Sequence, residues 1–397
     1  MLSREWLQTL ISITNYQYAP SNSAEAIANN QDLLAEILVR LPVKSLVRFK
    51  SVSKGWYSFI SDPRLSCRLL PDTVSGLFLC KTSRGKLEYE FVPLTHHKPP
   101  FKSLTFDDNP SGLRILQSCN GLLCCSSDYA YSNKQDYYIY NPTTKQYFKL
   151  PQLAIEDTIK IYGVGLAFDP AKSCHYKVVF VRQANFSDHD KNCYQIEVYS
   201  SQTRSWSLSG SQFVAPNGTD FKAGVFCNGA IHWPFRLYFN VDEEKLGEIA
   251  TMPPIPEEWQ ERTLPIYFGA SRNNLQLIEI YGPLTTQFNI YELQNDYSSW
   301  FVKYHVDLEA ISAAFPGMMI RNPSGYVFSI LSVVREAVDE ESYLVLHIPG
   351  MAIHYNLKYG IFRKICDFAS NDNYPIHNYP RYYWDDASPF IPTLSPV

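Results

Sequence analysis

Apolar residues recur at helical spacing three times between residues 29 and 70, with an interruption after each set. The first stripe runs from Leu33 to Leu41 and is followed by Pro42, which is unfavourable inside a helix. The second stripe begins at Val43. The third runs from Trp56 to Ile60, and Ser53 before it offers an N-cap oxygen. This pattern predicts three short helices, each with an apolar face.

Helices this short cannot bury all of their apolar side chains against one another. Helices below about 12–15 residues are marginal in water, and domains of about 40 residues usually need outside support. The missing cover must come from the rest of the chain or from another protein. The pattern therefore fits either a helical cap on the next domain or a docking surface.

The period changes to two after Thr73. Alternating residues run from Ser75 to Val92 around an Arg84-Gly85 turn, which predicts a β-hairpin, and Asn120-Gly121 marks another tight turn. Aromatic residues make up 15% of the chain, and 26 Pro and 18 Gly are spread along it. Aromatic runs cut by turn residues are typical of an all-β domain.

One strand–turn–strand pattern recurs in this part of the chain: a strand ending in an aromatic residue, a polar turn, then a second strand. Copies begin at Tyr137, Gln195, Arg236, Phe288 and Met351. The period of roughly 40–65 residues is in the range of propeller blades. We therefore predict an irregular β-propeller, with a pair of stacked sheets as the alternative. The strands within 76–92 are expected to close the ring with C-terminal strands.

Charge and composition exclude several classes of protein. The 397-residue chain has a net charge of -4, which argues against binding nucleic acid or anionic membranes through bulk charge. Its nine cysteines include no CxxC pair, a pattern that fits a reducing compartment. We see no secretory signal and no apolar run of about 18 residues. We expect the protein in the cytoplasm, the nucleus or both, with no membrane partner.

No catalytic motif is present. GxSxG, P-loop and HExxH sequences are absent, and Gly163-Val-Gly165 lacks the third glycine of a dinucleotide loop. The paired acids Asp107-Asp108 and Asp385-Asp386 fit solvated turns better than a glycosidase dyad. The sequence predicts no catalytic residue, no metal site and no cofactor. An enzyme stays an alternative on fold alone.

The helical stretch DLLAEILVRLPVKSLVRFKSVSKGWYSFISDP closely resembles an F-box of the plant type. Asn29-Asn30 stands where that family usually has Leu-Pro, and Asn is a good helix N-cap. The resemblance implies docking on the Skp-family adaptor of an SCF ubiquitin ligase and, through it, on the cullin scaffold. The contact residues that it implies are Leu33, Leu34, Ile37, Leu38, Leu41, Pro42, Val43, Leu46, Val52 and Trp56.

The segments SCNGLLCC, YYIYNPTTKQYFKLP and GLAFDPAKSCHYKVVFV resemble the F-box-associated domain, described as a kelch-like propeller. The residues from Ser388 onward resemble its short terminal strand. The expected fold is mainly β with a small N-terminal all-α domain. We assign 1–28 to a flexible tail (or a docking helix), 29–70 to the F-box and 71–397 to the propeller-like domain.

The family implies a non-catalytic substrate-recognition subunit whose inter-strand loops read a protein target. Candidate loops are Asn185–Asn192, Pro254–Arg262, Arg335–Ser342 and Asn371–Asp386. The last is rich in residues common at binding hot spots, and its candidate contacts are Tyr379, Arg381, Tyr382 and Trp384. These aromatic residues can equally pack the last blade. An F-box module acting outside the ligase is the main functional alternative.

Overall fold

The computed structural model divides into two compact units, Met1–Leu70 and Pro71–Val397. The structure describes residues 30–41, 43–62, 65, 74–83, 86–96, 98–105, 112–127, 135–153, 160–184, 193–216, 219–234, 236–251, 253, 267–280, 285–321, 324–368 and 382–397. The predicted N-terminal tail, 1–28, lies outside these residues.

Helices make up most of the described part of the first unit. They are α3 (Gln31–Leu38), α4 (Val43–Lys50) and α5 (Lys54–Ile60). The Asn30 side chain caps α3 by accepting two backbone N–H groups of the first turn, each at 3.1 Å. Ser53 caps α5 by accepting the N–H of Trp56 at 3.2 Å. The three predicted helices are confirmed, but α3 ends at Leu38 rather than Leu41 because the chain forms a turn there.

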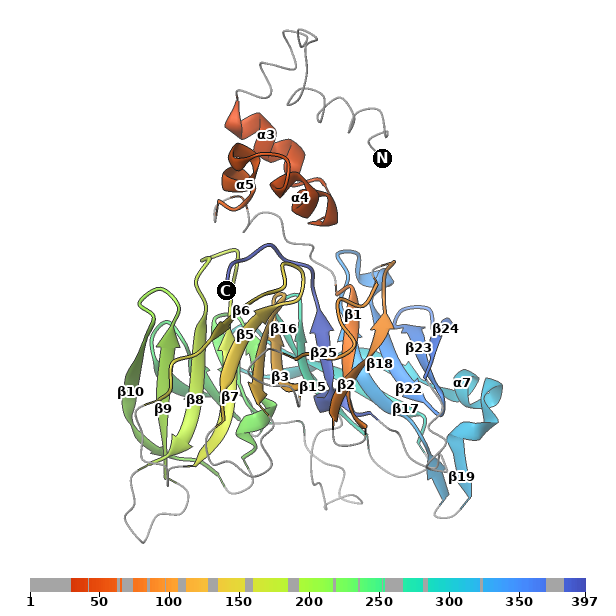
Figure 1. Cartoon of the computed structure of the whole chain (residues 1–397). Helices are drawn as coiled ribbons and strands as arrows, with labels where there is room; N and C mark the ends of the chain where they lie inside the picture. Colours follow the sequence, from red (N-terminus) through yellow and green to blue (C-terminus); the bar gives the residue numbers. More distant parts are fainter. Residues whose placement is uncertain are drawn as a thin grey trace, which may run out of the picture. The chain divides into compact units, whose positions relative to one another are not determined.

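The second unit is a six-bladed β-propeller, not a pair of stacked sheets (Figure 1). Five blades are four-stranded antiparallel sheets whose strands follow one another along the chain. Their strands are β3 (Leu113–Cys119), β4 (Leu122–Ser127), β5 (Tyr137–Asn141) and β6 (Gln146–Lys149) in blade 2; β7 (Ile161–Ala167), β8 (Lys177–Gln183), β9 (Cys193–Ser200) and β10 (Ser205–Val214) in blade 3; β11 (Val225–Cys227), β12 (Ala230–His232), β13 (Leu237–Asn240) and β14 (Lys245–Glu248) in blade 4; β15 (Tyr267–Ser271), β16 (Asn274–Glu279), β17 (Gln287–Leu293) and β18 (Trp300–Asp307) in blade 5; and β21 (Ser329–Val334), β22 (Tyr343–Ile348), β23 (Met351–Asn356) and β24 (Phe362–Asp367) in blade 6.

Blade 1 joins the two ends of the unit. It contains β1 (Gly76–Ser83), β2 (Lys86–Pro93) and, from the C-terminal end, β25 (Ala387–Phe390). β25 pairs antiparallel with β1, from Gly76 opposite Phe390 to Leu79 opposite Ala387, and Figure 1 shows the two strands side by side. The predicted ring closure is confirmed.

The core consists of apolar clusters between neighbouring blades. One cluster lies at each of the six interfaces, from blades 1 and 2 around to blades 6 and 1. Blade-to-blade contacts run through β25, β3, β7, β11, β15 and β21, which identifies these as the inner strands. Between blades 5 and 6 the chain also forms α7 (Glu309–Ala314) and a hairpin of β19 (Met319–Arg321) and β20 (Ser324–Tyr326).

The recurrent polar turn of the sequence is a structural repeat between third and fourth strands. In blades 2, 4 and 6 an asparagine oxygen accepts two backbone N–H groups two and three residues further on; these residues are Asn141, Asn240 and Asn356. Four residues later the backbone is left-handed, at Lys145 (φ 60°), Glu244 (φ 53°) and Gly360 (φ 65°). An Asx turn is therefore the physical basis of the repeat.

Asn141 has a second role, because the segment 391–397 beyond β25 lies against it. Its amide nitrogen donates to the carbonyl oxygens of Thr393, at 3.1 Å, and Ser395, at 2.8 Å. Asn141 and Thr393 are 0% exposed. The C-terminal segment is thereby attached to blade 2 after the ring has closed.

We expect Asn141→Ala to destabilise the protein by about 2–4 kcal/mol, because it removes the turn and leaves two carbonyl groups unsatisfied. Asn240→Ala, the matched control, loses only the turn and should cost about 1 kcal/mol. Urea unfolding followed by tryptophan fluorescence measures both. Equal losses would show that the C-terminal attachment contributes nothing.

Candidate functional site

The helical unit has a small interior of buried apolar side chains. Leu38, Leu46 and Ile60, one from each helix, are 0% exposed. Phe49 is also buried, and its ring centroid lies 5.4 Å from that of Trp56. These residues form the interior that the three apolar stripes predicted.

Other apolar side chains of the same helices stay in contact with water. Leu33 is 49% exposed, Val47 36% and Tyr57 54%. Leu34 and Ile37 are half-buried, and their spacing puts them on neighbouring parts of the α3 surface. So much exposed apolar surface on so small a unit is typical of a protein-interaction site.

The predicted adaptor contacts fall into separate groups in the structure. Leu38, Val43 and Leu46 are buried. Leu33 is exposed, and Leu34, Ile37, Leu41, Val52 and Trp56 are half-buried. Pro42 lies outside the described residues. We therefore expect the docking surface to be formed by the exposed and half-buried residues. Leu38, Val43 and Leu46 are buried and cannot contact a partner, so we expect them to support that surface from inside.

Two exposed residues were missing from that prediction. Val47 belongs to the apolar stripe of the second helix, and Tyr57 follows Trp56 in the third. Both lie on the accessible surface. Helical periodicity shows that a face is apolar, but it does not show whether the other helices cover that face.

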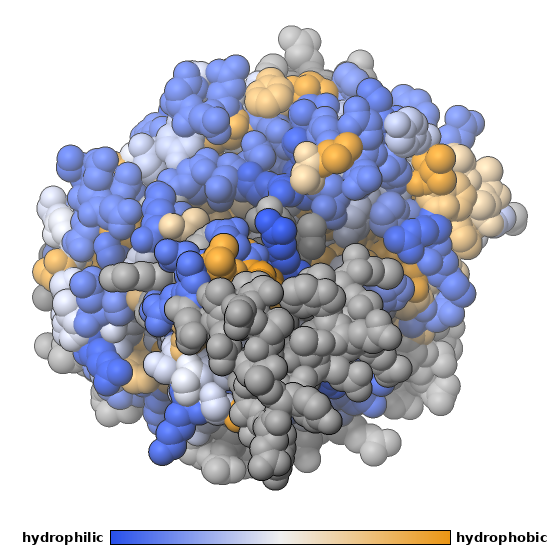
Figure 2. Space-filling model, turned by 90° about the horizontal axis from the view of Figure 1, so that it is seen from above, coloured by the Kyte–Doolittle hydropathy of each residue, from blue (hydrophilic) through white to orange (hydrophobic). Residues whose placement is uncertain are grey.

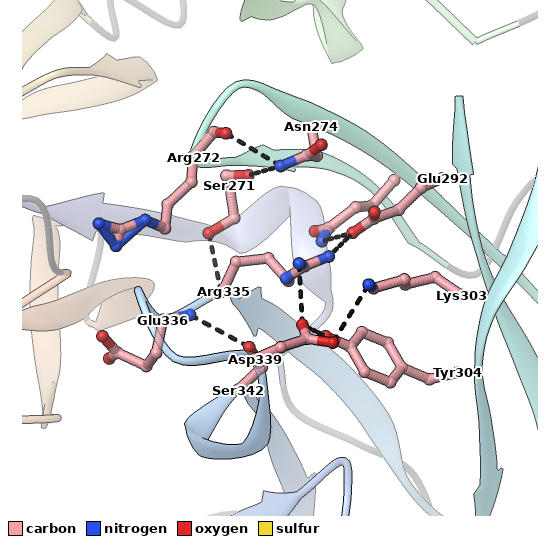
Figure 3. Close-up of polar contacts among 11 residues, drawn as sticks. Ser271, Arg272, Asn274, Glu292, Lys303, Tyr304, Arg335, Glu336, Asp339 and Ser342 are labelled. Atoms are coloured by element: carbon pink, nitrogen blue, oxygen red, sulfur yellow. Dashed lines mark hydrogen bonds and ion pairs between the residues drawn. The ribbon is translucent and has the colours of Figure 1, made fainter. Parts of the chain in front are cut away.

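The loop 335–342 between β21 and β22, one of the predicted target-reading loops, is held by charges shared with blade 5 (Figure 3). The Arg335 guanidinium pairs with Glu292 of β17 and, at 2.8 Å, with Asp339. Lys303 of β18 lies 3.1 Å from Asp339, and the Tyr304 hydroxyl donates to the same carboxylate. The loop is thereby fixed to the neighbouring blade.

Backbone hydrogen bonds hold the same loop at both of its ends. The N–H of Arg335 donates to Ser271 Oγ at 2.9 Å, and the N–H of Glu336 donates to Ser342 Oγ at 3.1 Å. Between these ends, Val338 is 51% exposed. The loop therefore presents an apolar side chain from a fixed backbone.

The electrostatics of this cluster agree with its geometry. Burial alone would raise the pKa of Asp339, but Tyr304, Lys303 and Arg335 outweigh it, so this pKa lies below its usual value. The pKa of Tyr304 is raised, first by burial and then by its hydrogen bond to Asp339. In Figure 3 the Glu336 carboxylate points away from the cluster, and burial raises its pKa.

Two of the four predicted target contacts before β25, Tyr382 and Trp384, lie among the described residues. Tyr382 is 1% exposed and belongs to the cluster between blades 6 and 1, where its hydroxyl donates to Glu90 at 2.6 Å. Trp384 is half-buried against the core of blades 5 and 6. Tyr379 and Arg381 lie outside the described residues. For Tyr382 the packing alternative holds, because this side chain fills the space where the chain returns from blade 6 to blade 1.

The other predicted loops, Asn185–Asn192 and Pro254–Arg262, also lie outside the described part of the chain.

Within the described part, no group of three or more His, Cys, Asp or Glu is placed to hold a metal ion. No helix in that part is both long and apolar enough to span a membrane. Burial raises the pKa of the thiols of Cys119, Cys124 and Cys227 to about 12, which keeps them protonated.

Comparison with known proteins matches both units. Residues 30–68 match the family model of the F-box domain, and residues 77–249 match that of the F-box associated beta propeller domain. The Arabidopsis thaliana F-box protein At5g07610 is 38% identical over 385 residues, which cover 88% of each chain. The F-box protein At5g49610 of the same plant is 28% identical over 318 residues, covering 75% of this chain and 84% of that protein.

Arg335→Met should destabilise the protein by about 3–5 kcal/mol, because it leaves the buried charge of Glu292 uncompensated. The double change Arg335→Met with Glu292→Leu should lose clearly less. Lys364→Met, which removes an exposed ion pair with Asp367, is the control and should cost at most about 0.5 kcal/mol. Urea unfolding measures all three; a double variant as unstable as the single one contradicts the expectation.

The pH dependence of Asp339→Asn follows from the lowered pKa of Asp339. Stability from a lowered carboxyl pKa is present above the usual value, 3.8, and is lost as pH falls through the folded value. The variant should therefore be less stable than the parent at pH 7, and the difference should shrink steadily below pH of about 4. A difference that stays constant down to pH 3 would rule out this linkage.

Proposed function

The chain belongs to the F-box protein family, and we propose that it is the substrate-recognition subunit of an SCF-type E3 ubiquitin ligase. The F-box binds a Skp-family adaptor, which connects it to a cullin, while the propeller binds the target protein. The subunit makes no bond itself. By holding a target lysine near the ubiquitin-charged enzyme, it raises their effective concentration.

The observation that carries this proposal is the exposed apolar surface of the helical unit, within the segment that matches the F-box. Leu33 is 49% exposed and Tyr57 54%, although the unit is too small to leave such surface without cost. Covering these side chains with a partner removes that cost. We also propose that the protein works in the cytoplasm, the nucleus or both, where such ligases need their adaptors.

We propose that the loop 335–342 contributes to the target-binding surface together with the adjacent turn between β23 and β24. The two are tied together, because Asn356 Nδ2 donates to the carbonyl oxygen of Glu340 at 2.8 Å. Val338, Tyr359 and Ile361 on them are 51%, 63% and 68% exposed. On the face seen in Figure 2, the coloured atoms are mostly hydrophilic and apolar residues form small separate groups. A rigid site with several apolar side chains therefore stands out as a candidate contact.

Adaptor binding tests the proposal. Leu33→Asp with Leu41→Asp should weaken binding to a purified Skp-family adaptor by about 100-fold or more, because both side chains lie on the expected docking surface. Tyr359→Asp with Ile361→Asp, two more exposed apolar residues on the propeller, is the control and should leave adaptor affinity unchanged. Isothermal titration calorimetry measures both, and circular dichroism checks that each variant is folded.

Undiminished adaptor binding by the folded Leu33→Asp, Leu41→Asp variant would remove this docking surface. Adding the cullin and its partner enzymes separates the remaining possibilities. Assembly of the adaptor complex with the cullin supports a ligase subunit. Adaptor binding without cullin assembly supports an F-box module that acts outside the ligase.

A further inference from the structure

Strand β10 is the outer strand of blade 3, and it differs from the outer strands of the other blades. Its ten residues, SWSLSGSQFV, make it the longest described strand. It contains neither a charged residue nor a proline, whereas β2, β6, β14, β18 and β24 each contain Lys or Arg. Figure 1 shows β10 at the edge of the propeller, and in the described sheet only β9 pairs with it.

This composition matters because an outer strand has main-chain groups that no neighbour satisfies. Proteins commonly protect such edges with charged side chains, lysine above all, or with proline, which prevent another strand from pairing. The other outer strands of this propeller follow that rule. β10 does not, so its edge is open to an added strand.

The regular part of the edge is five residues long. Ser205 to Ser209 pair in register with β9, and the register breaks before Phe213. At the break Gly210 is left-handed (φ 61°), and the buried amide of Gln195 donates to the carbonyl oxygens of Ser209, at 3.0 Å, and Gly210, at 3.3 Å. The bulge ends the flat edge, which spans about 17 Å.

The side chains of this five-residue edge hold it in place and leave room beside it. Trp206 Nε1 donates to the carbonyl oxygen of Pro151 at 2.8 Å, and its ring centroid lies 4.7 Å from that of Phe180. Leu208 is 57% exposed, and Ser207 is also exposed. Leu208 and the half-buried Trp206 lie on one face of this edge, and the exposed Ser205 and Ser207 lie on the other. A strand laid along it would therefore meet apolar side chains on one face and small hydroxyls on the other, and no charged residue of the edge itself.

We propose that the β10 edge binds an extended, uncharged segment of the target protein as an added strand of blade 3. Main-chain hydrogen bonds supply the affinity, and an apolar side chain beside Leu208 supplies selectivity. A second copy of this chain is a poorer occupant, because five paired residues bury far less than the roughly 1,000 Å² that a stable dimer needs. The inference rests on the proposed function, which requires a protein target.

A synthetic strand tests the edge directly. The probe is a nine-residue peptide of alternating threonine and valine, with both ends capped, added to the full chain bound to its adaptor. Hydrogen exchange followed by mass spectrometry should show slower exchange within 205–209 and no change in β18. The same peptide with alternate amides N-methylated should not bind, because it lacks the donors. Equal binding by the methylated peptide, or protection elsewhere only, overturns the proposal.

Two variants complete the test. Leu208→Lys should weaken peptide binding, measured by fluorescence anisotropy, by about tenfold or more, because it restores the missing edge charge. Val302→Lys, on the outer strand β18 and 40% exposed, is the matched control and should change nothing. If neither variant weakens binding, the edge is not the site. If Leu208→Lys instead converts a dimer into a monomer in analytical ultracentrifugation, the occupant is a second copy and the proposal fails.

Adaptor affinity, measured on the same samples, keeps the two proposals apart. If the parent chain binds its adaptor but not the peptide, the edge site alone is overturned. Peptide binding without adaptor binding overturns the ligase function and leaves a strand-binding propeller.

Discussion

The pairing of β25 with β1 is the contact on which the propeller depends. Blade 1 is built from both ends of the unit, so the ring has no closed form until these strands meet. Two of the six apolar clusters, those with blades 2 and 6, use side chains of this blade as one wall. Closure also removes the free sheet edges that an open ring would expose. The segment after β25 then reaches blade 2, where the Asn141 side-chain amide donates to the carbonyl oxygens of Thr393 and Ser395.

Apolar contacts fill the space between blades, and several ion pairs lie where strands end and turns begin. The Arg335 cluster lies at such a place and joins a loop of blade 6 to blade 5. Most outer edges carry charges that keep other strands away, and β10 is the exception. The propeller thus has two fixed features suited to holding a protein: an anchored loop with an exposed Val338 and a neutral strand edge.

The helical unit differs from the propeller in how much of its apolar surface is covered. Its interior contains few side chains, and apolar residues such as Leu33 and Tyr57 remain exposed to solvent. A core this small usually needs support from outside itself. The match to the F-box family model and the exposed apolar residues therefore both indicate a protein-interaction surface on this unit. In the function we propose, one unit provides attachment to a complex, and the other provides rigid surfaces for a target.

The local sequence pattern alone predicts the secondary-structure elements of this protein and the repeats that they form. The three helices, the caps at Asn30 and Ser53 and the repeated strand–turn–strand units follow from periodicity and turn chemistry between residues close in sequence. Tertiary structure decided the rest: the blade number, the burial of Leu46, the packing role of Tyr382 and the Arg335 cluster. Glu292 lies 43 residues from Arg335, and Glu90 lies 292 residues from Tyr382. No local pattern specifies such pairs, because the side chains meet only after the ring has brought distant strands together.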